Sequence, residues 1–180
     1  NIRKAASDAM QNGQTRYVPG KGTPELQKAI QSKFQKDNNL NYELDEIIVG
    51  VGGKHIIYNA MMATINPNDE VIIPAPYWVS YPDIVLLAEG RPVIVECPEN
   101  QNFKITADQL EKTITIKTKW LMLNSPSNPT GSLYSKNELK ELAAVLLEHP
   151  QVLIMSDDIY EKIIYDNSEF ATLASVEPKL

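Results

Sequence analysis

The 180 residues include a single cysteine and only two histidines, and these scarcities exclude two classes of protein. Cys97 has no second cysteine with which to form a disulfide inside the chain, so this is not a disulfide-stabilised domain. His55 and His149 lie far apart and do not form the closely spaced pair typical of a metal centre. No metal site is predicted.

Long apolar runs and blocks of positive charge are also absent. No stretch reaches the length of a membrane-spanning helix, and no signal peptide is recognisable. The net charge is −6, with acidic and basic residues interspersed. Nucleic acid and membranes are therefore not expected partners, and small molecules are the class of partner that remains. With 43% apolar residues the chain can bury a hydrophobic core as one domain. We expect a cytoplasmic protein. Because it opens on Asn1 rather than methionine, we expect it to be part of a longer protein.

Five short apolar runs bounded by turn residues predict buried strands. They lie at residues 47–51, 71–73, 93–95, 120–123 and 152–155. Helical patterns alternate with them, and three helix starts are signalled by the residues Thr23-Pro24-Glu25 and by the capping boxes Thr106–Gln109 and Ser135–Glu138. The alternation with short links predicts a doubly wound α/β fold, a mostly parallel sheet with helices on both faces.

The segment Asn124–Gly131 directly follows the predicted strand at 120–123. Two prolines and a glycine restrict its backbone and so fix the position of Asn128. Open α/β sheets bind ligands outside the carboxyl ends of their strands, so Asn128 is a candidate ligand-binding residue. The alternative is an ordinary turn between a strand and a helix.

The residues Gly52-Gly53-Lys54 open a predicted helix after the first predicted strand. Free backbone N–H groups and the helix dipole favour a phosphate at such a position. The two common nucleotide motifs do not fit, however. A phosphate-binding P-loop needs glycine at Ile48 and Ser or Thr at His55, and a dinucleotide fingerprint needs glycine at His55. A nucleotide-binding module is therefore a poor alternative.

Two further strand ends carry candidate site residues. Trp78 lies on a proline-fixed loop after strand 71–73 and offers a flat face for stacking, although tryptophans more often pack in cores. Asp157 follows strand 152–155 and faces the same crevice as Asn128, unless it is a solvated loop acid. Together these residues match the needs of pyridoxal phosphate (PLP), which requires a phosphate cradle, a flat ring surface, a donor at its phenolic oxygen and a carboxylate at its ring nitrogen. A carboxylate at that nitrogen favours the protonated form on which electron withdrawal depends.

The sequence resembles a class I aminotransferase of the aspartate aminotransferase superfamily, in the bacterial-type subgroup, over essentially all 180 residues. The motifs that carry the resemblance are Tyr17 with its Gly-rich loop, Val51-Gly52-Gly53-Lys54, Pro76–Tyr81, Asn124–Gly131 and Ser156-Asp157-Asp158-Ile159-Tyr160. The implied fold is the large PLP-binding domain of that family.

The resemblance also implies roles for individual residues in binding PLP. Gly53 and Lys54 would donate backbone N–H groups to the phosphate, and Trp78 would stack on the ring. Asn128 and Tyr160 would bind the phenolic oxygen, with Asn128-Pro129 in the cis form, and Asp157 would pair with the ring nitrogen. Tyr17 would reach across a homodimer to the partner's phosphate. Trp78, Asn128 and Lys54 would contact the substrate, and the lysine cation favours an acidic one.

One element of the family pattern is missing. The lysine that binds PLP covalently should follow the Asp-x-x-Tyr strand in a Ser/Thr-x-x-Lys loop, and the sequence reaches Leu180 without it. Lys162 and Lys179 lie in the wrong sequence context. We therefore expect residues 1–180 to be a partial large domain without the N-terminal arm, the lysine segment or the small domain, and to be inactive alone.

For the full-length protein the resemblance implies transfer of an amino group from an amino acid, aspartate in the first place, to a 2-oxo acid such as 2-oxoglutarate. Fold and cofactor do not fix the reaction, so several alternatives stay open. These are an aromatic or alanine aminotransferase, a C–S β-lyase, and a non-catalytic regulatory domain on the same PLP fold.

Overall fold

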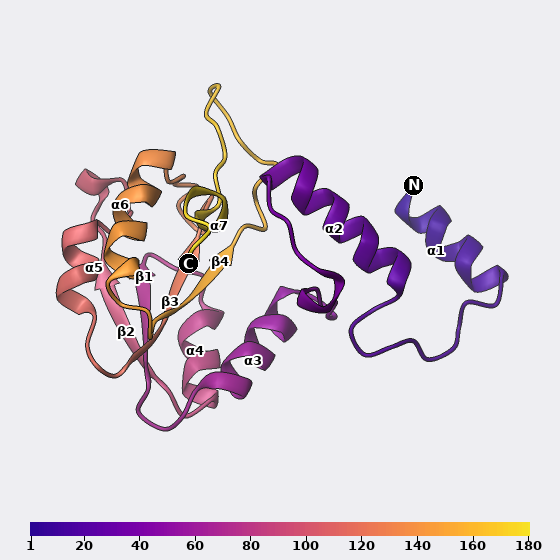
Figure 1. The fold of residues 1–180 in the computed structure, drawn as a ribbon, viewed down its shortest axis with the longest axis horizontal. Helices are drawn as coiled ribbons and strands as arrows, with labels where there is room; N and C mark the ends of the chain where they lie inside the picture. Colours follow the sequence, from indigo (N-terminus) through magenta and orange to yellow (C-terminus); the bar gives the residue numbers. More distant parts are fainter.

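A computed structural model describes residues 1–180 and contains one four-stranded parallel sheet (Figure 1). The strands are β1 (Glu70–Ala75), β2 (Arg91–Glu96), β3 (Thr118–Asn124) and β4 (Leu153–Asp157). Their spatial order is β2-β1-β3-β4, so the first strand of the sheet in the sequence lies in its interior. Every pairing is parallel, which brings the carboxyl ends of all four strands to the same edge of the sheet.

Helices cover both faces of the sheet, so the predicted doubly wound architecture is confirmed. One face packs against α3 (Gly53–Thr64) and α4 (Ser80–Leu87) through a cluster that includes Val71, Ile73 and Met122 of the strands. The other face uses the alternate strand positions, among them Ile72 and Leu121. It packs against α5 (Ala107–Thr113), α6 (Lys136–Leu147) and α7 (Leu173–Val176). Successive strand residues thus serve opposite layers, as the pleat requires.

The three predicted helix starts are confirmed. Thr23 caps α2 (Pro24–Asn38), with its side chain accepting a hydrogen bond from the Leu26 N–H, and a proline occupies the first helical position. Thr106 with Gln109 and Ser135 with Glu138 form reciprocal capping boxes at the heads of α5 and α6. Such caps satisfy N–H groups that the first helical turn leaves without partners.

The predicted strand at residues 47–51 does not form. The backbone at Ile47 is extended (φ −111°, ψ 123°), as its β-branched side chain favours, and Ile47 is buried. However, a strand also needs a neighbour to complete its hydrogen-bond ladder, and here the Val49 N–H donates to the carbonyl of Lys21 in a loop. Ile48 and Val51 remain 66% and 90% exposed. The glycine pair therefore follows an extended segment outside the sheet.

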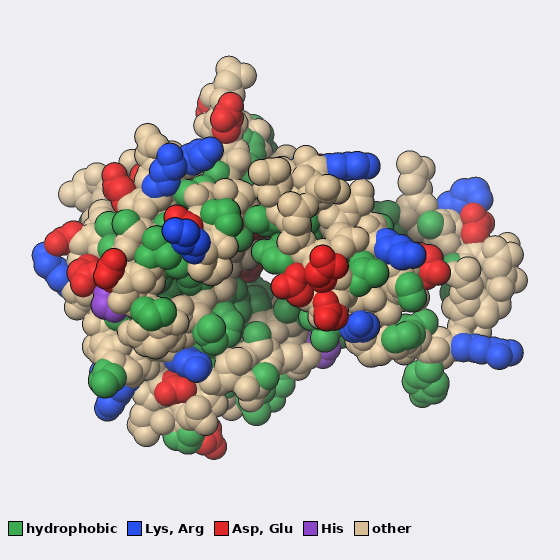
Figure 2. Space-filling model, viewed as in Figure 1, with side chains coloured by type: hydrophobic (Ala, Val, Ile, Leu, Met, Phe, Trp, Pro, Cys, Tyr) green, Lys and Arg blue, Asp and Glu red, His purple; other side chains and the backbone are tan.

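The polar N-terminal region contains a helix that the sequence analysis did not predict, α1 (Ile2–Gln11). Figure 1 shows α1 and α2 extending to one side of the sheet, joined by the loop that carries Tyr17. None of the residues of α1 is buried, and Tyr17 is fully exposed. None of the helices of the chain combines the length and the apolar character needed to cross a membrane. Charges of both signs are scattered over the face shown in Figure 2.

Glu161 ties the end of α2 to the segment after β4, and this tie predicts a pH-dependent stability. Lys33 Nζ lies 2.5 Å from Glu161 Oε1, and the Asn38 amide donates to Oε2 at 3.0 Å. Burial alone would raise the pKa of Glu161, but Lys33 and Asn38 outweigh it and hold the pKa below the ordinary 4.5. The contribution of Glu161 is therefore complete above pH 4.5 and is lost as the pH falls through the lowered pKa.

We expect Glu161→Gln to lower the free energy of unfolding by about 1 kcal/mol near neutral pH. Urea unfolding of wild type and variant at about pH 7 and about pH 3 measures the difference, which should become smaller at the lower pH. A difference of the same size at both pH values would contradict this role of the Glu161 carboxylate.

Candidate active site

A cavity of about 360 Å³ opens at the carboxyl edge of the sheet, beside the first turn of α3. Its lining comes from four separate segments of the chain. The residues that line it are Gly52, Gly53, Lys54, Ile57, Trp78, Tyr81, Asn124, Asn128, Asp157, Ile159 and Tyr160. Six of the seven predicted cofactor-binding residues are among them, so the topology brings together what the sequence analysis grouped by chemistry.

The first turn of α3 presents free hydrogen-bond donors to this cavity. Gly52 occupies the N-cap position with φ +112° and ψ 159°, and no side chain caps the helix. The backbone N–H groups of Gly53, Lys54 and His55 donate to no acceptor within the chain. With the positive end of the helix dipole behind them, these donors form a cradle suited to an anion such as a phosphate.

Trp78 and Lys54 lie against each other on one side of the cavity. The Lys54 Nζ is 5.0 Å from the centroid of the Trp78 ring, within the range of a cation–π contact. Trp78 is half-buried, and Lys54 is exposed. The cavity therefore combines a flat aromatic surface with a positive charge that has no carboxylate partner in the chain.

Asn124 connects two of the predicted site residues. It is the last residue of β3 and pairs in register with Asp157, the last residue of β4. Its amide nitrogen donates to the Asp157 carbonyl at 2.7 Å, and its amide oxygen accepts from the Asn128 N–H, also at 2.7 Å. Asn128-Pro129 is cis, as predicted from the family resemblance. One side chain thus fixes the backbone of Asn128 relative to that of Asp157.

Asp157 is held at its side chain as well. The Tyr81 hydroxyl donates to Asp157 Oδ2 at 2.6 Å, whereas Oδ1 accepts no hydrogen bond within the chain. The side-chain amide of Asn128 and the hydroxyl of Tyr160 also have no partner in the chain. The cavity is therefore lined by several polar atoms that can serve a ligand.

The structure does not bring every residue considered in the sequence to this cavity. Tyr17 lies outside it, on the exposed loop before α2. Lys162 pairs with Asp37 on the surface, at 2.8 Å, and Lys179 lines a different groove. Lys54 is the one lysine that lines the cavity.

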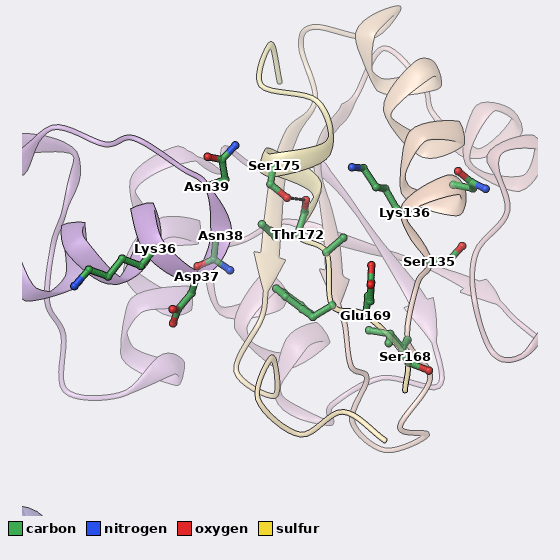
Figure 3. A pocket seen from close by; sticks show the side chains of 14 residues that line it. Lys36, Asp37, Asn38, Asn39, Ser135, Lys136, Ser168, Glu169, Thr172 and Ser175 are labelled. Carbon is green, nitrogen blue, oxygen red and sulfur yellow. Dashed lines mark hydrogen bonds between the residues drawn. The ribbon is translucent and has the colours of Figure 1, made fainter. Parts of the chain in front are cut away.

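A larger cleft of about 710 Å³ lies elsewhere, between the end of α2, the start of α6 and residues 168–175 (Figure 3). None of the predicted site residues lines it. Some of its polar groups already have partners: the Ser175 hydroxyl donates to the Thr172 carbonyl, and Asp37 accepts from Lys162, which lies outside the lining of the cleft. The size of a cleft is therefore not what identifies the site in this protein.

Two residues of the cavity, Tyr81 and Asn124, have contacts that the sequence alone did not reveal. Tyr81 has the sequence context of an ordinary residue at a helix start, and its partner Asp157 is 76 positions away. Asn124 stands at the head of the segment that drew attention to Asn128, but its bonds depend on the register between β3 and β4. A tyrosine that is buried needs a hydrogen-bond partner for its hydroxyl, and this requirement is the signal that could have pointed to Tyr81.

Comparisons with known proteins identify the family of the chain. The family model described as "Aminotransferase class I and II" matches residues 1–180. This chain belongs to that family. It is 57% identical over its whole length to the "Probable aspartate/prephenate aminotransferase" of Rickettsia bellii, of which it covers 45%.

Solved structures of the family have the same fold. The crystal structure of the aspartate aminotransferase from Rhizobium meliloti matches with a TM-score of 0.98 and 53% identity, over 99% of this chain and 45% of that one. The aspartate aminotransferase from Thermus thermophilus with maleate matches with a TM-score of 0.94 and 41% identity, over 98% of this chain and 46% of that one. The chain therefore spans less than half the length of the relatives that it matches.

Proposed function

We propose that residues 1–180 are part of the large, PLP-binding domain of an aminotransferase. In this proposal the full-length protein, as a homodimer, moves an amino group from an amino acid, aspartate in the first place, to a 2-oxo acid such as 2-oxoglutarate. The observation that carries the proposal is the single cavity at the sheet edge, which gathers an anion cradle, an indole face, an amide, a phenol and a carboxylate from four chain segments.

The residues of the cavity fit the parts of PLP. The free N–H groups of Gly53 and Lys54 suit the doubly charged phosphate, and the indole of Trp78 suits the face of the pyridine ring. Asn128 and Tyr160 have unused donors for the phenolic oxygen. Asp157 has one unused carboxylate oxygen, Oδ1, for the protonated ring nitrogen.

When bound, PLP with a protonated ring nitrogen withdraws electrons from the α-carbon of an attached amino acid. The part of this chain is to bind and orient: Asp157 holds the proton at the ring nitrogen, and the start of α3 holds the phosphate. We propose that the lysine that moves the substrate proton lies outside residues 1–180. The full exposure of Tyr17, away from its own cavity, supports the proposal that it reaches the phosphate site of a partner subunit.

The proposal is tested by treating the purified full-length protein with stoichiometric PLP and borohydride, and then measuring intact mass and mapping the peptides. We expect one reduced PLP on a lysine outside residues 1–180. The absence of any adduct would contradict the cofactor assignment. The isolated peptide of residues 1–180 should bind PLP weakly, and tight stoichiometric uptake by that peptide would show that the chain needs no further segment.

We propose an acidic amino acid as the substrate because Lys54 brings an unpaired positive charge to the cavity. The names of the relatives support this choice. Aspartate and prephenate each carry a second carboxylate, and so does the maleate in the Thermus thermophilus structure.

We expect Lys54→Met to lower kcat/KM for aspartate about 10- to 100-fold relative to alanine, the range expected for one hydrogen bond to a charged group. Half-reactions with aspartate, alanine, phenylalanine and cystathionine measure the change and also separate the alternative reactions. Lys112→Met is the matched control, since Lys112 pairs with Asp108 on the surface of α5. An equal loss for aspartate and alanine would contradict the role of Lys54 in substrate choice.

A further inference from the structure

Tyr81 is a buried residue of the cavity wall with two contacts to site residues. It is the second residue of α4, is 3% exposed, and lines the cavity. Its hydroxyl donates to Asp157 Oδ2 at 2.6 Å. Its ring meets the ring of Trp78 edge to face, with the centroids 5.6 Å apart and the planes at 89°. Tyr81 therefore touches both the carboxylate and the indole that the proposed function assigns to the cofactor ring.

The bond from Tyr81 to Asp157 has the length of a strong, charge-assisted O–H···O⁻ hydrogen bond. Burial first, and then the neighbouring carboxylate, raises the pKa of Tyr81 above its ordinary value. The phenol therefore stays protonated and acts as a donor across the physiological range. Because this donor occupies Oδ2, the carboxylate cannot rotate freely, and Oδ1 is left as the oxygen available to a ligand.

The second strongly buried tyrosine of the chain provides a contrast. Tyr134 is 4% exposed, and its hydroxyl accepts a hydrogen bond from the Ile105 N–H at 2.8 Å. That bond joins two loops and involves no residue of the candidate site. The two tyrosines are thus alike in burial and different in what their hydroxyls contact.

We infer that Tyr81 is a positioning residue, whose hydroxyl fixes the Asp157 carboxylate so that Oδ1 faces the ring nitrogen of PLP while its ring braces Trp78. This inference rests on the proposed function and deepens it. It attributes the orientation of the Asp157 carboxylate to Tyr81, which touches this carboxylate directly and lines the wall of the cavity. Loss of the hydroxyl alone should then loosen the carboxylate without removing it.

The test compares Tyr81→Phe with Tyr134→Phe in the full-length protein, because each change removes a single oxygen atom. PLP affinity is measured by titration, and the pH midpoint of the absorbance of the bound cofactor is measured in the same samples. We expect Tyr81→Phe to weaken PLP binding about 10-fold, the size of one hydrogen bond, and to move the midpoint upward, since the negative charge of Asp157 is no longer shared with a phenol. Tyr134→Phe should change neither quantity, and thermal unfolding shows whether both variants are folded.

A double-mutant cycle separates positioning from general packing. In an Asp157→Asn background, Tyr81→Phe should add little further loss of PLP affinity, because the two side chains act through one bond. A Tyr81→Phe protein with the affinity and midpoint of wild type, or equal effects of the two tyrosine variants, would overturn the inference and leave the proposed function standing. A wild-type protein that takes up no PLP would overturn both.

Discussion

Replacement of Asp157 with alanine in the full-length protein is expected to slow amino-group transfer by about 100-fold or more. In the proposed function this carboxylate keeps a proton on the ring nitrogen of PLP, and loss of one preorganised electrostatic partner in an active site commonly costs this much. Single-turnover half-reactions with aspartate measure the chemical step apart from product release. Turnover equal to wild type in this variant would contradict the cofactor assignment.

The neighbouring aspartate is the matched control for this prediction. Asp158 accepts a hydrogen bond from the Ser156 hydroxyl at 2.8 Å and lines a separate groove rather than the cavity. Burial is the largest influence on Asp158 and raises its pKa. The charged form of Asp158 therefore lowers the free energy of unfolding, and this loss grows as the pH rises. We expect Asp158→Asn to transfer amino groups like wild type and to be no less stable near neutral pH.

Gly52→Ala is expected to destabilise the protein by about 1–3 kcal/mol and to weaken PLP binding by about 10-fold or more. Gly52 has a backbone conformation, φ +112° with ψ 159°, that is essentially restricted to glycine, and forcing another residue into it carries a cost of that size. A Cβ atom at this position would meet nothing within 4 Å, so the cost comes from the backbone and not from a clash. Relief of the strain would turn the free N–H groups of α3 away from the cavity.

Gly53→Ala provides the comparison for stability. Gly53 is the first residue of α3 and has no positive φ, and a Cβ atom added to it would likewise meet nothing within 4 Å. Alanine fits a helix better than glycine, so the midpoint of thermal unfolding should stay the same or rise slightly. Equal destabilisation by the two alanine substitutions would show that the backbone conformation of Gly52 is not the cause.

Features with a local physical cause could be predicted from the sequence. Thr23, Thr106 and Ser135 cap helices because their hydroxyls reach N–H groups two or three residues away. The apolar runs around Leu121 and Ile72 form strands because they bury on both faces, and parallel strands bring their carboxyl ends to one edge. The grouping of Trp78 and Asp157 at that edge follows from these local facts.

Features that depend on a partner far away in the sequence could not be predicted. Residues 47–51 have the composition of a strand, but a strand forms only beside another, and none lies there. The bond between Tyr81 and Asp157 requires the start of α4 to come close to the end of β4, which no spacing in the sequence reveals. The bridge made by Asn124 needs one particular register between two strands, and a slip of one residue would turn its side chain to the other face.

The cavity takes its lining from segments between Gly52 and Tyr160, so no short stretch of the chain contains it. It exists only once the sheet and α3 are assembled, and a ligand that binds there recognises the folded chain alone. By mass action, such a ligand at 100 times its Kd stabilises the folded state by about 2.7 kcal/mol. In the proposed function PLP is this ligand, so the supply of PLP in the cell would help to set how long the protein escapes degradation, independently of any demand for its reaction.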